Sequence, residues 1–301
     1  MSKMKSKFSL CVLELPKDFK IQLGEVHEKL SAKKFVELSP SQESGCGWVN
    51  PEDIFKTNFA IEDIVAAESI ICGFRFDKKS VPGPLVKKLF RERLKEREKE
   101  LGAKLEKAEK QLLKEECKEQ LLLKALPSPK MVQWIWNMVD NRIYLDMKSE
   151  KSIDDFIELF CKTFEGVTVQ RKNYGIPEDN VTLFLDWLWK QSTGPDGQWF
   201  DKGITLDADS NIFKFNGPTL EAFLDQIEAM KEGKSVKEIC IGCALCGNDY
   251  YITFNSKNLI VTVDNTNKIK YESTEAAVLD REDISSKVVE KIENLITEYL
   301  K

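Results

Sequence analysis

The stretch from Val81 to Pro129 constrains the fold most, because prolines at both ends enclose some forty charge-dense residues. Pro84 suits the first position of a helix, where a missing N–H costs nothing, and Pro127 and Pro129 end the helical pattern. Gly102 falls in the interior of this helical pattern, where glycine lowers helix stability by roughly 1 kcal/mol relative to Ala. We therefore expect a Lys/Glu-rich helical stretch over about 84–125, kinked or split into two helices near Gly102. One narrow apolar seam is predicted along it: Leu94, Leu101, Leu105, Ala108 and Leu112.

The charges on this stretch allow two interpretations. Residues 84–124 hold 13 Lys/Arg and 9 Glu, a net charge of +4, whereas the whole chain carries −5. Four cations at spacings of three and four share one helix face: Lys88, Arg91, Lys95 and Lys99. Glutamates lie one residue further round: Glu92, Glu96 and Glu100. On pattern alone a solvated face balanced by these acids is favoured, and the alternative is a stripe that faces phosphates.

Length and charge distribution bound the organisation of the chain. With 301 residues, 42% apolar content and six Trp, the sequence predicts a folded protein of one to three domains. Residues 1–125 contain 25 basic and 21 acidic residues, a net charge of +4. Residues 126–301 contain 20 basic and 29 acidic residues, a net charge of −9. A polyanionic partner would therefore favour the N-terminal part. We expect an N-terminal α+β part (1–80), the long helical stretch (81–130) and a C-terminal α+β part (131–301), with interleaving into one unit left open.

The sequence predicts neither a membrane span nor an export signal. No run approaches eighteen apolar residues, and the apolar run 8–13 is too short for a signal-peptide core. A cytoplasmic location is therefore expected, with the eight Cys as reduced thiols. The single histidine, His27, makes His-based triads and His-rich metal sites implausible. It lies beside the apolar stripe of a predicted helix, which favours a structural role over a catalytic one.

The order of predicted elements indicates the fold class. Strands are predicted over 6–15, 66–76, 132–136, 142–146, 167–171, 204–206, 212–215, 238–244, 250–254 and 259–263, and helices over 19–35, 152–164, 179–190, 219–230 and 284–300. Residues 36–58 are predicted as loop. A turn near Asp140-Asn141 would join two of the strands into a hairpin. Because the strands are consecutive rather than alternating with helices, the sequence favours α+β with antiparallel sheets.

Motifs for catalysis and cofactors are weak. There is no GxGxxG or GxxxxGK[ST] sequence, and no cofactor is expected. Cys240, Cys243 and Cys246 lack the fourth ligand that zinc or an iron–sulfur cluster would need, so buried thiols are favoured over a metal site. A nuclease motif can be placed on Pro195-Asp196 and Glu232-Gly233-Lys234 only by treating a turn as a strand. The six Trp could stack nucleic-acid bases, but a core role is favoured, above all for Trp134 and Trp136, which share a strand face.

An ordered set of short motifs resembles the RdgC family, the recombination-associated proteins of bacteria. The order and spacing agree over about residues 5–165 and more loosely beyond. The motifs are GWV at 47–49, IIC at 70–72, KSVPGPLVK at 79–87, LLLKA at 121–125, WIW at 134–136 and RIYLD at 142–146.

The resemblance implies a fold and a function. It implies horseshoe-like α+β subunits that form a ring-shaped homodimer around DNA, lined with positive charge. It also implies sequence-independent binding, mainly to double-stranded DNA, association with the nucleoid, and indirect restraint of RecA through shared DNA. Such an arrangement suits an acidic chain if the basic residues face the cavity. The family is also described as an exonuclease, and nothing in the sequence supports that activity.

The resemblance also suggests particular residues. Lys87 lies in the KSVPGPLVK motif and joins Lys88, Arg91, Lys95 and Lys99 as a predicted DNA contact. Lys124-Ala125-Leu126 replaces an Arg-Ala-Phe-like element, so Lys124 and Leu126 are predicted at a dimer contact, with Lys124 also facing DNA. Compared with Arg, Lys124 keeps the positive charge but cannot form bidentate hydrogen bonds. Compared with Phe, Leu126 keeps an apolar side chain but has less surface to bury. Lys214 and Asn216 are the candidates for a basic–amide pair that contacts DNA.

Three hypotheses follow from the sequence. The leading one is a DNA-binding homodimer without catalysis, a role in recombination or replication being implied by the family. The second is a metal-dependent nuclease, which requires carboxylates that converge in space. The third is a scaffold that dimerises through the 85–122 helices and does not bind DNA.

Overall fold

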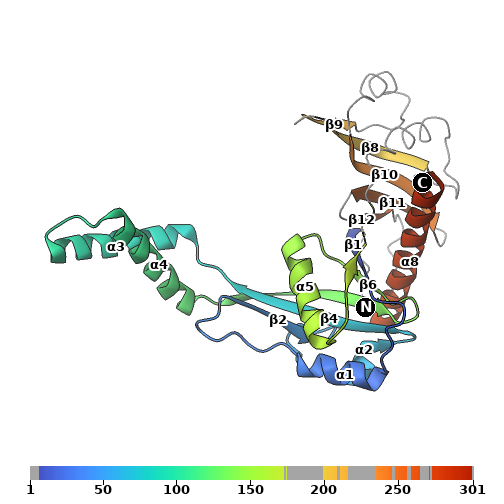
Figure 1. The fold of residues 1–301 in the computed structure, drawn as a ribbon, viewed down its shortest axis with the longest axis horizontal. Helices are drawn as coiled ribbons and strands as arrows, with labels where there is room; N and C mark the ends of the chain where they lie inside the picture. Colours follow the sequence, from blue (N-terminus) through green and yellow to red (C-terminus); the bar gives the residue numbers. More distant parts are fainter. Residues whose placement is uncertain are drawn as a thin grey trace. The chain divides into compact units, whose positions relative to one another are not determined.

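The chain divides into two compact units, each assembled from segments that are distant in sequence. The computed structural model describes residues 7–172, 174, 199–208, 211–215, 235–245, 248–255, 259–264, 271 and 273–299 (Figure 1). The first unit comprises 1–21, 64–71 and 133–301, and the second comprises 22–63 and 72–132. Strands β4 (Ser69–Lys79) and β5 (Pro127–Asn137) each run from one unit into the other.

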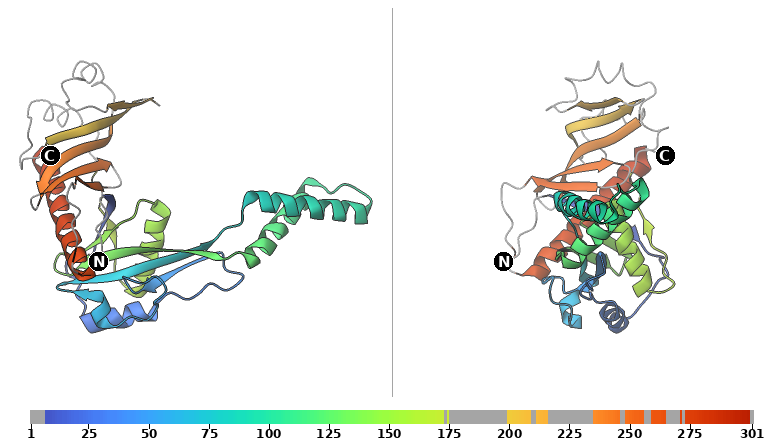
Figure 2. Two further views of the ribbon diagram at one scale, coloured as in Figure 1. Left: turned by 180° about the vertical axis from the view of Figure 1, so that it is seen from behind. Right: turned by 90° about the vertical axis from the view of Figure 1, so that its left-hand side faces the viewer.

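Antiparallel strands form the frame of the first unit (Figure 2). β1 (Lys7–Glu14) pairs with β12 (Leu259–Asp264), with β6 (Arg142–Leu145) and with the short β7 (Gln170–Arg171). β6 also pairs with β5 across a turn in which Asn141 has φ +53°. Beyond β12 the order continues through β11 (Asn248–Asn255), β10 (Ser235–Leu245), β8 (Trp199–Ala208) and β9 (Asn211–Phe215). β3 (Val65–Ala66), preceded by α2 (Ile61–Ile64), pairs with the start of β4.

An aromatic core joins β5 to α5 (Glu150–Thr163). Trp134 and Trp136 are fully buried, and Trp136 lies edge-to-face with Phe160 and Phe164 at centroid distances of 5.7 and 5.5 Å. The Trp134 ring lies 5.5 Å from that of Phe156. Residues two apart on a strand thus meet residues four apart on a helix, because each pair points to one side of its element. The predicted core role of these Trp is confirmed.

Asp146 lies where β1 changes partner. Residues 7–10 of β1 pair with β12, whereas residues 11–14 pair with β6. Near this change the backbone N–H of Ser9, a buried residue, donates to Asp146 Oδ1 at 2.8 Å. Asp146 also pairs with Arg281, 3.5 Å away, on the C-terminal helix α8 (Thr274–Tyr299). Burial lowers the pKa of the Arg281 guanidinium, and the Asp146 carboxylate opposes that shift.

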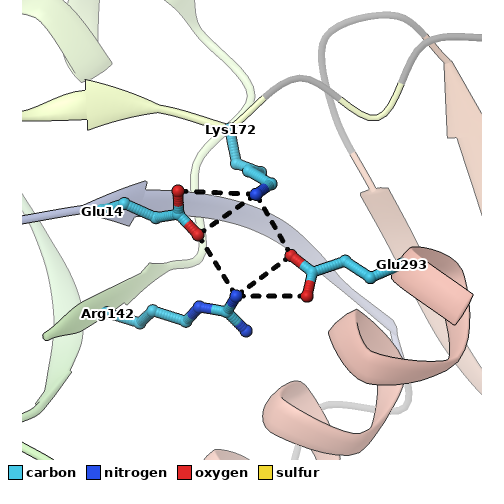
Figure 3. A network of polar contacts seen from close by, with 4 residues as sticks. All are labelled: Glu14, Arg142, Lys172 and Glu293. Carbon is cyan, nitrogen blue, oxygen red and sulfur yellow. Dashed lines mark hydrogen bonds and ion pairs between the residues drawn. The ribbon is translucent and has the colours of Figure 1, made fainter. Parts of the chain in front are cut away.

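Further polar contacts attach α8 to the strands. Glu282 accepts hydrogen bonds from Ser69 Oγ at 2.6 Å and from the Asn137 side-chain amide at 2.8 Å. Figure 3 shows a second attachment, in which Glu293 of α8 and Glu14 of β1 meet Arg142 and Lys172. The apolar face of the helix is buried along the same segment, at Val278, Ile284, Val288, Val289 and Ile292.

A close backbone approach shapes the second unit. Its β2 (Ser44–Val49) pairs antiparallel with β4, and α1 (Leu23–Ala32) buries Val26 and Leu30. The segment after α1 lies against β2, where Phe35 N–H donates to the Trp48 carbonyl at 2.9 Å. A Cβ on Gly47 would lie 2.3 Å from Phe35 Cα, so this position admits only glycine.

The structure confirms the mixed α+β class and corrects part of the element assignment. Residues 36–58, predicted as loop, contain β2, whose two glycines weaken the strand pattern. The predicted helices over 179–190 and 219–230 lie outside the described residues. The horseshoe shape and the three-part division at 80 and 130 stay predictions. No helix within the described ranges is long and apolar enough to cross a membrane.

Removing the Asp146 carboxylate should destabilise the protein. In Asp146→Ala the Ser9 N–H and Arg281 lose this partner in a buried setting, at a cost of about 1–3 kcal/mol in the free energy of unfolding. Urea denaturation measures the change. The control Asp154→Ala removes an exposed carboxylate of α5 and should stay within about 0.5 kcal/mol of the parent. Equal effects of the two substitutions would contradict the assigned role.

Two glycine substitutions should act in opposite directions. Gly47→Ala forces apart β2 and the Phe35 backbone and should lower stability by about 1–3 kcal/mol. Gly24→Ala, in α1 with no atom within 4 Å of the added Cβ, should raise it by up to about 1 kcal/mol. Thermal unfolding of both variants tests the pair, and a neutral Gly47→Ala would disprove the close approach.

Candidate nucleic-acid interface

Two helices in series occupy the stretch between the prolines. α3 (Gly83–Leu101) begins after Pro82 and ends at Gly102, whose φ of +63° is left-handed and therefore suits glycine. α4 (Lys107–Lys124) begins with a capping box between Glu106 and Glu109. Both ends of the break are thus encoded locally, by one glycine and two glutamates.

The two helices pack as an antiparallel hairpin (Figure 2). Arg93 of α3 donates to Gln120 of α4 at 3.3 Å, and Glu98 pairs with Lys110 at 3.6 Å, so positions later in α3 meet earlier positions in α4. The buried residues of the hairpin are Val86, Leu105, Leu113 and Cys117.

The predicted apolar seam is wrong in part. Leu105 is buried as expected, but Leu101 and Leu112 are 59% and 60% exposed. The seam assumed one continuous helix, whereas the break at Gly102 resets the helical phase before α4. Leu113 and Cys117 consequently take the inward positions.

The predicted basic residues of α3 are all exposed: Lys87, Lys88, Arg91, Lys95 and Lys99. Across the part of the chain that the structure describes, none of these five forms an ion pair within 4.0 Å. The stripe from Lys88 to Lys99 extends for about 17 Å at a rise of 1.5 Å per residue. We call these five residues the α3 basic face. Its cations are not neutralised by direct pairing with the glutamates of α3, so they are available to an anionic partner.

The remaining predicted contacts are distributed over other elements. Lys124 is the exposed last residue of α4, and Leu126, two residues later, is 87% exposed. Lys214 lies in β9, where it is in register with Thr205 of β8. Asn216 lies outside the described residues. The roles of all these residues in binding DNA or a second subunit stay predictions.

Other candidate chemistry is limited. Cys240 and Cys243 lie in β10 opposite Thr253 and Tyr250, and Cys246 falls outside the described residues. Among the residues that are described, no group of three His, Cys, Asp or Glu could hold a metal ion. The carboxylates of the weak nuclease motif, Asp196 and Glu232, are not among them. His27 Nε2 donates to the Phe59 carbonyl at 2.8 Å, a structural contact as predicted.

A charged network borders a pocket in the first unit. Arg142 Nη2 lies 3.2 Å from Glu14 and 3.1 Å from Glu293, and Lys172 lies 3.3 Å from both carboxylates (Figure 3). Burial alone would lower the pKa of Arg142, and Glu293 and Glu14 hold it above its ordinary value. Glu14 and Arg142 line a pocket of about 520 Å³. Two cations face two anions, so the network has no excess charge to attract DNA. No local pattern predicts this network, because Arg142 and Glu293 are 151 residues apart in the chain.

Comparison with known proteins identifies the family. The sequence matches the family model described as "Putative exonuclease, RdgC" over residues 9–241. The Recombination-associated protein RdgC of Aeromonas hydrophila subsp. hydrophila is 31% identical over 182 residues, covering 59% of this chain and 58% of that protein. Proteins of the same name from Enterobacter sp. (strain 638) and Edwardsiella ictaluri (strain 93-146) are each 28% identical over 162 residues, covering 54% of this chain and 52% of each relative.

The chain is matched over different lengths by its relatives and by the family model. The alignments span between half and three fifths of the relatives' length. The family model, in contrast, matches well over half of this chain, and its range includes the α3–α4 hairpin and the Trp-containing strand β5. The resemblance inferred from the ordered motifs is therefore confirmed, and the chain belongs to the RdgC family.

Proposed function

We propose that this chain is a sequence-independent DNA-binding protein that acts in recombination, mainly on double-stranded DNA. The observation that carries the proposal is the α3 basic face. The helix holds seven Lys/Arg against four Glu, although the chain as a whole is acidic. Phosphates of duplex DNA recur every 3.4 Å or so along each strand, so a rigid cationic stripe can contact several of them without reading bases. The relatives' name, recombination-associated protein, supports the cellular role.

Binding occurs as a homodimer in this proposal. Five leucines in and beside the hairpin leave half or more of their surface exposed: Leu85, Leu101, Leu112, Leu123 and Leu126. At the loop end, a pocket of about 380 Å³ is lined by four leucines and four charged residues: Leu101, Leu105, Leu112, Leu113, Arg97, Glu100, Glu109 and Glu116. Leu101 and Leu112 are exposed and line the same pocket, and a contiguous apolar surface is typical of an interaction site. Closure of the dimer into a ring around DNA, association with the nucleoid and indirect restraint of RecA are the finer parts of the proposal, and they come from the family resemblance.

Charge reversal on α3 tests DNA binding. Fluorescence anisotropy of a labelled random-sequence duplex, titrated over a salt series, should give sequence-indifferent binding with a steep negative salt slope. Replacing Lys88, Arg91 and Lys95 by Glu should weaken binding at least about tenfold and reduce the salt slope by about three. The matched control reverses Lys20, Lys148 and Lys151, three exposed lysines of the first unit, and should change little.

The outcomes of this experiment separate the three hypotheses. Absence of binding at low salt would overturn the proposal and favour the scaffold that dimerises without DNA. Equal losses in the two triple variants would show that net charge matters and the α3 basic face does not. The same duplex with Mg²⁺ or Mn²⁺ and excess protein should remain intact, and accumulation of product would establish the nuclease alternative instead.

Sedimentation tests the dimer contact. Leu126→Asp places a charge at the 87% exposed predicted contact and should raise the dimer dissociation constant at least about tenfold. Leu112→Asp tests the surface at the loop end of the hairpin in the same way. Val139→Asp, 66% exposed in the first unit, is the control that should sediment like the parent. A parent protein that is monomeric at high concentration would refute the homodimer.

A further inference from the structure

A second series of lysines runs along α4. Its members recur at spacings of 3, 4 and 4, as do the four cations of α3 from Lys88 to Lys99: Lys107, Lys110, Lys114 and Lys118. Lys110 pairs with Glu98 of α3 at 3.6 Å. The other three are exposed, and none of them forms an ion pair within 4.0 Å with any residue that the structure describes. We call Lys107, Lys114 and Lys118 the α4 lysine row, which extends for about 17 Å along the helix.

The pocket at the loop end of the hairpin marks one side of both helices. Its lining includes three residues from each helix: Arg97, Glu100 and Leu101 of α3, and Glu109, Leu112 and Glu116 of α4. Successive residues of an α-helix are about 100° apart around its axis. The pocket therefore gives each helix a reference direction from which its other side chains are measured.

Both rows of cations point away from the pocket. Around the axis of α4, the centre of the α4 lysine row lies about 170° from the centre of the pocket residues. The buried Leu113 and Cys117 lie between these two groups, where α4 packs on α3. Around the axis of α3, the stripe from Lys88 to Lys99 also lies about 170° from the pocket residues. The two rows therefore share the side of the hairpin opposite the pocket.

The carboxylates of the hairpin do not neutralise this side. Glu109 and Glu116 of α4 line the pocket. By helical position, Glu92 of α3 and Glu115 of α4 border the outer edges of the two rows, and Glu115 accepts a hydrogen bond from Gln111 at 2.8 Å. Glu98 lies between the rows and pairs with Lys110. The α3 basic face and the α4 lysine row together therefore give one side of the hairpin a positive charge.

Two cationic rows on one side suit the two phosphate strands of a duplex. The axes of packed helices are about 8–10 Å apart, and the cationic side chains extend beyond them. In B-DNA the strands border a minor groove about 6 Å wide and a major groove about 12 Å wide. A cationic row on each helix can therefore contact both strands at once, whereas a single strand supplies one line of phosphates and needs only one row.

We propose that the α4 lysine row contacts one phosphate strand of a duplex while the α3 basic face contacts the other. The α4 lysine row is then the feature that favours double-stranded over single-stranded DNA. This inference rests on the proposed DNA-binding function and names further residues that carry it. The pocket side, with the exposed Leu101 and Leu112, is left accessible to a second subunit while DNA is bound.

Neutralising the α4 lysine row tests the assignment in the full-length chain. The variant combines Lys107→Gln, Lys114→Gln and Lys118→Gln, and Gln has a helix propensity close to that of Lys. In fluorescence anisotropy, binding of a labelled duplex should weaken at least about tenfold, with a log–log salt slope smaller by about three. Binding of a labelled oligothymidylate of the same length should weaken less than about threefold, because the α3 basic face still accommodates one strand.

The matched control makes the same charge change in the first unit. It combines Lys20→Gln, Lys148→Gln and Lys151→Gln, all at exposed positions, and should bind both DNAs like the parent. Thermal unfolding checks each variant. If the triple α4 variant proves unstable, Lys114→Gln alone should reduce the duplex salt slope by about one.

The outcomes separate this inference from the proposed function. A parent protein that does not bind the duplex refutes DNA binding itself. If the parent binds and reversal of the α3 cations weakens binding, but neutralising the α4 lysine row does not, only the present inference is overturned. Equal losses for duplex and oligothymidylate also overturn it, because the second row would then not distinguish two strands from one.

Discussion

The fold of the first unit depends on how β1 is shared between two ladders. A strand that changes partner leaves backbone groups near the change without a ladder partner, and buried N–H groups need an acceptor. The Asp146 carboxylate supplies one to Ser9 and at the same time pairs with Arg281 of α8. The polar group that permits the exchange of partners therefore also attaches the C-terminal helix, and the Glu293 network extends that attachment to the other end of β1.

Charge is segregated by element rather than by overall composition. An acidic chain can bind a polyanion only if its cations gather where local pairing does not neutralise them. α3 meets this condition, since its five outward cations form no direct ion pair among the described residues. Around Arg75 of β4, in contrast, charges of both signs pair directly, because Arg75 contacts both Asp77 and Glu37.

The parts that the sequence predicted are those governed by local periodicity. The Trp134–Trp136 strand, its hairpin to β6 and the amphipathic α5 follow from spacings of two and of three to four. The exposed α3 basic face follows for the same reason. The prediction that Leu101 and Leu112 belong to a buried seam was wrong, because the break at Gly102 changes the helical phase between α3 and α4. Strand β2 was not predicted, because its Gly47 is required by a close approach to the Phe35 backbone that only the folded structure shows. Contacts such as Arg142 with Glu293 depend on tertiary placement and leave no pattern.

Helix α3 shows why the candidate interface and the stability of the hairpin belong together. Of its 19 residues, all of them described, only Val86 is buried. An isolated helix of this length is marginal in water, and most helices are stabilised by burying an apolar face. α3 obtains little of that stabilisation from its own chain, so its formation relies on Pro84, on its charged helix formers and on packing with α4. Binding phosphates along one side, or a second subunit along the exposed leucines, would stabilise the folded hairpin by mass action. Binding and local folding are therefore thermodynamically coupled in this element.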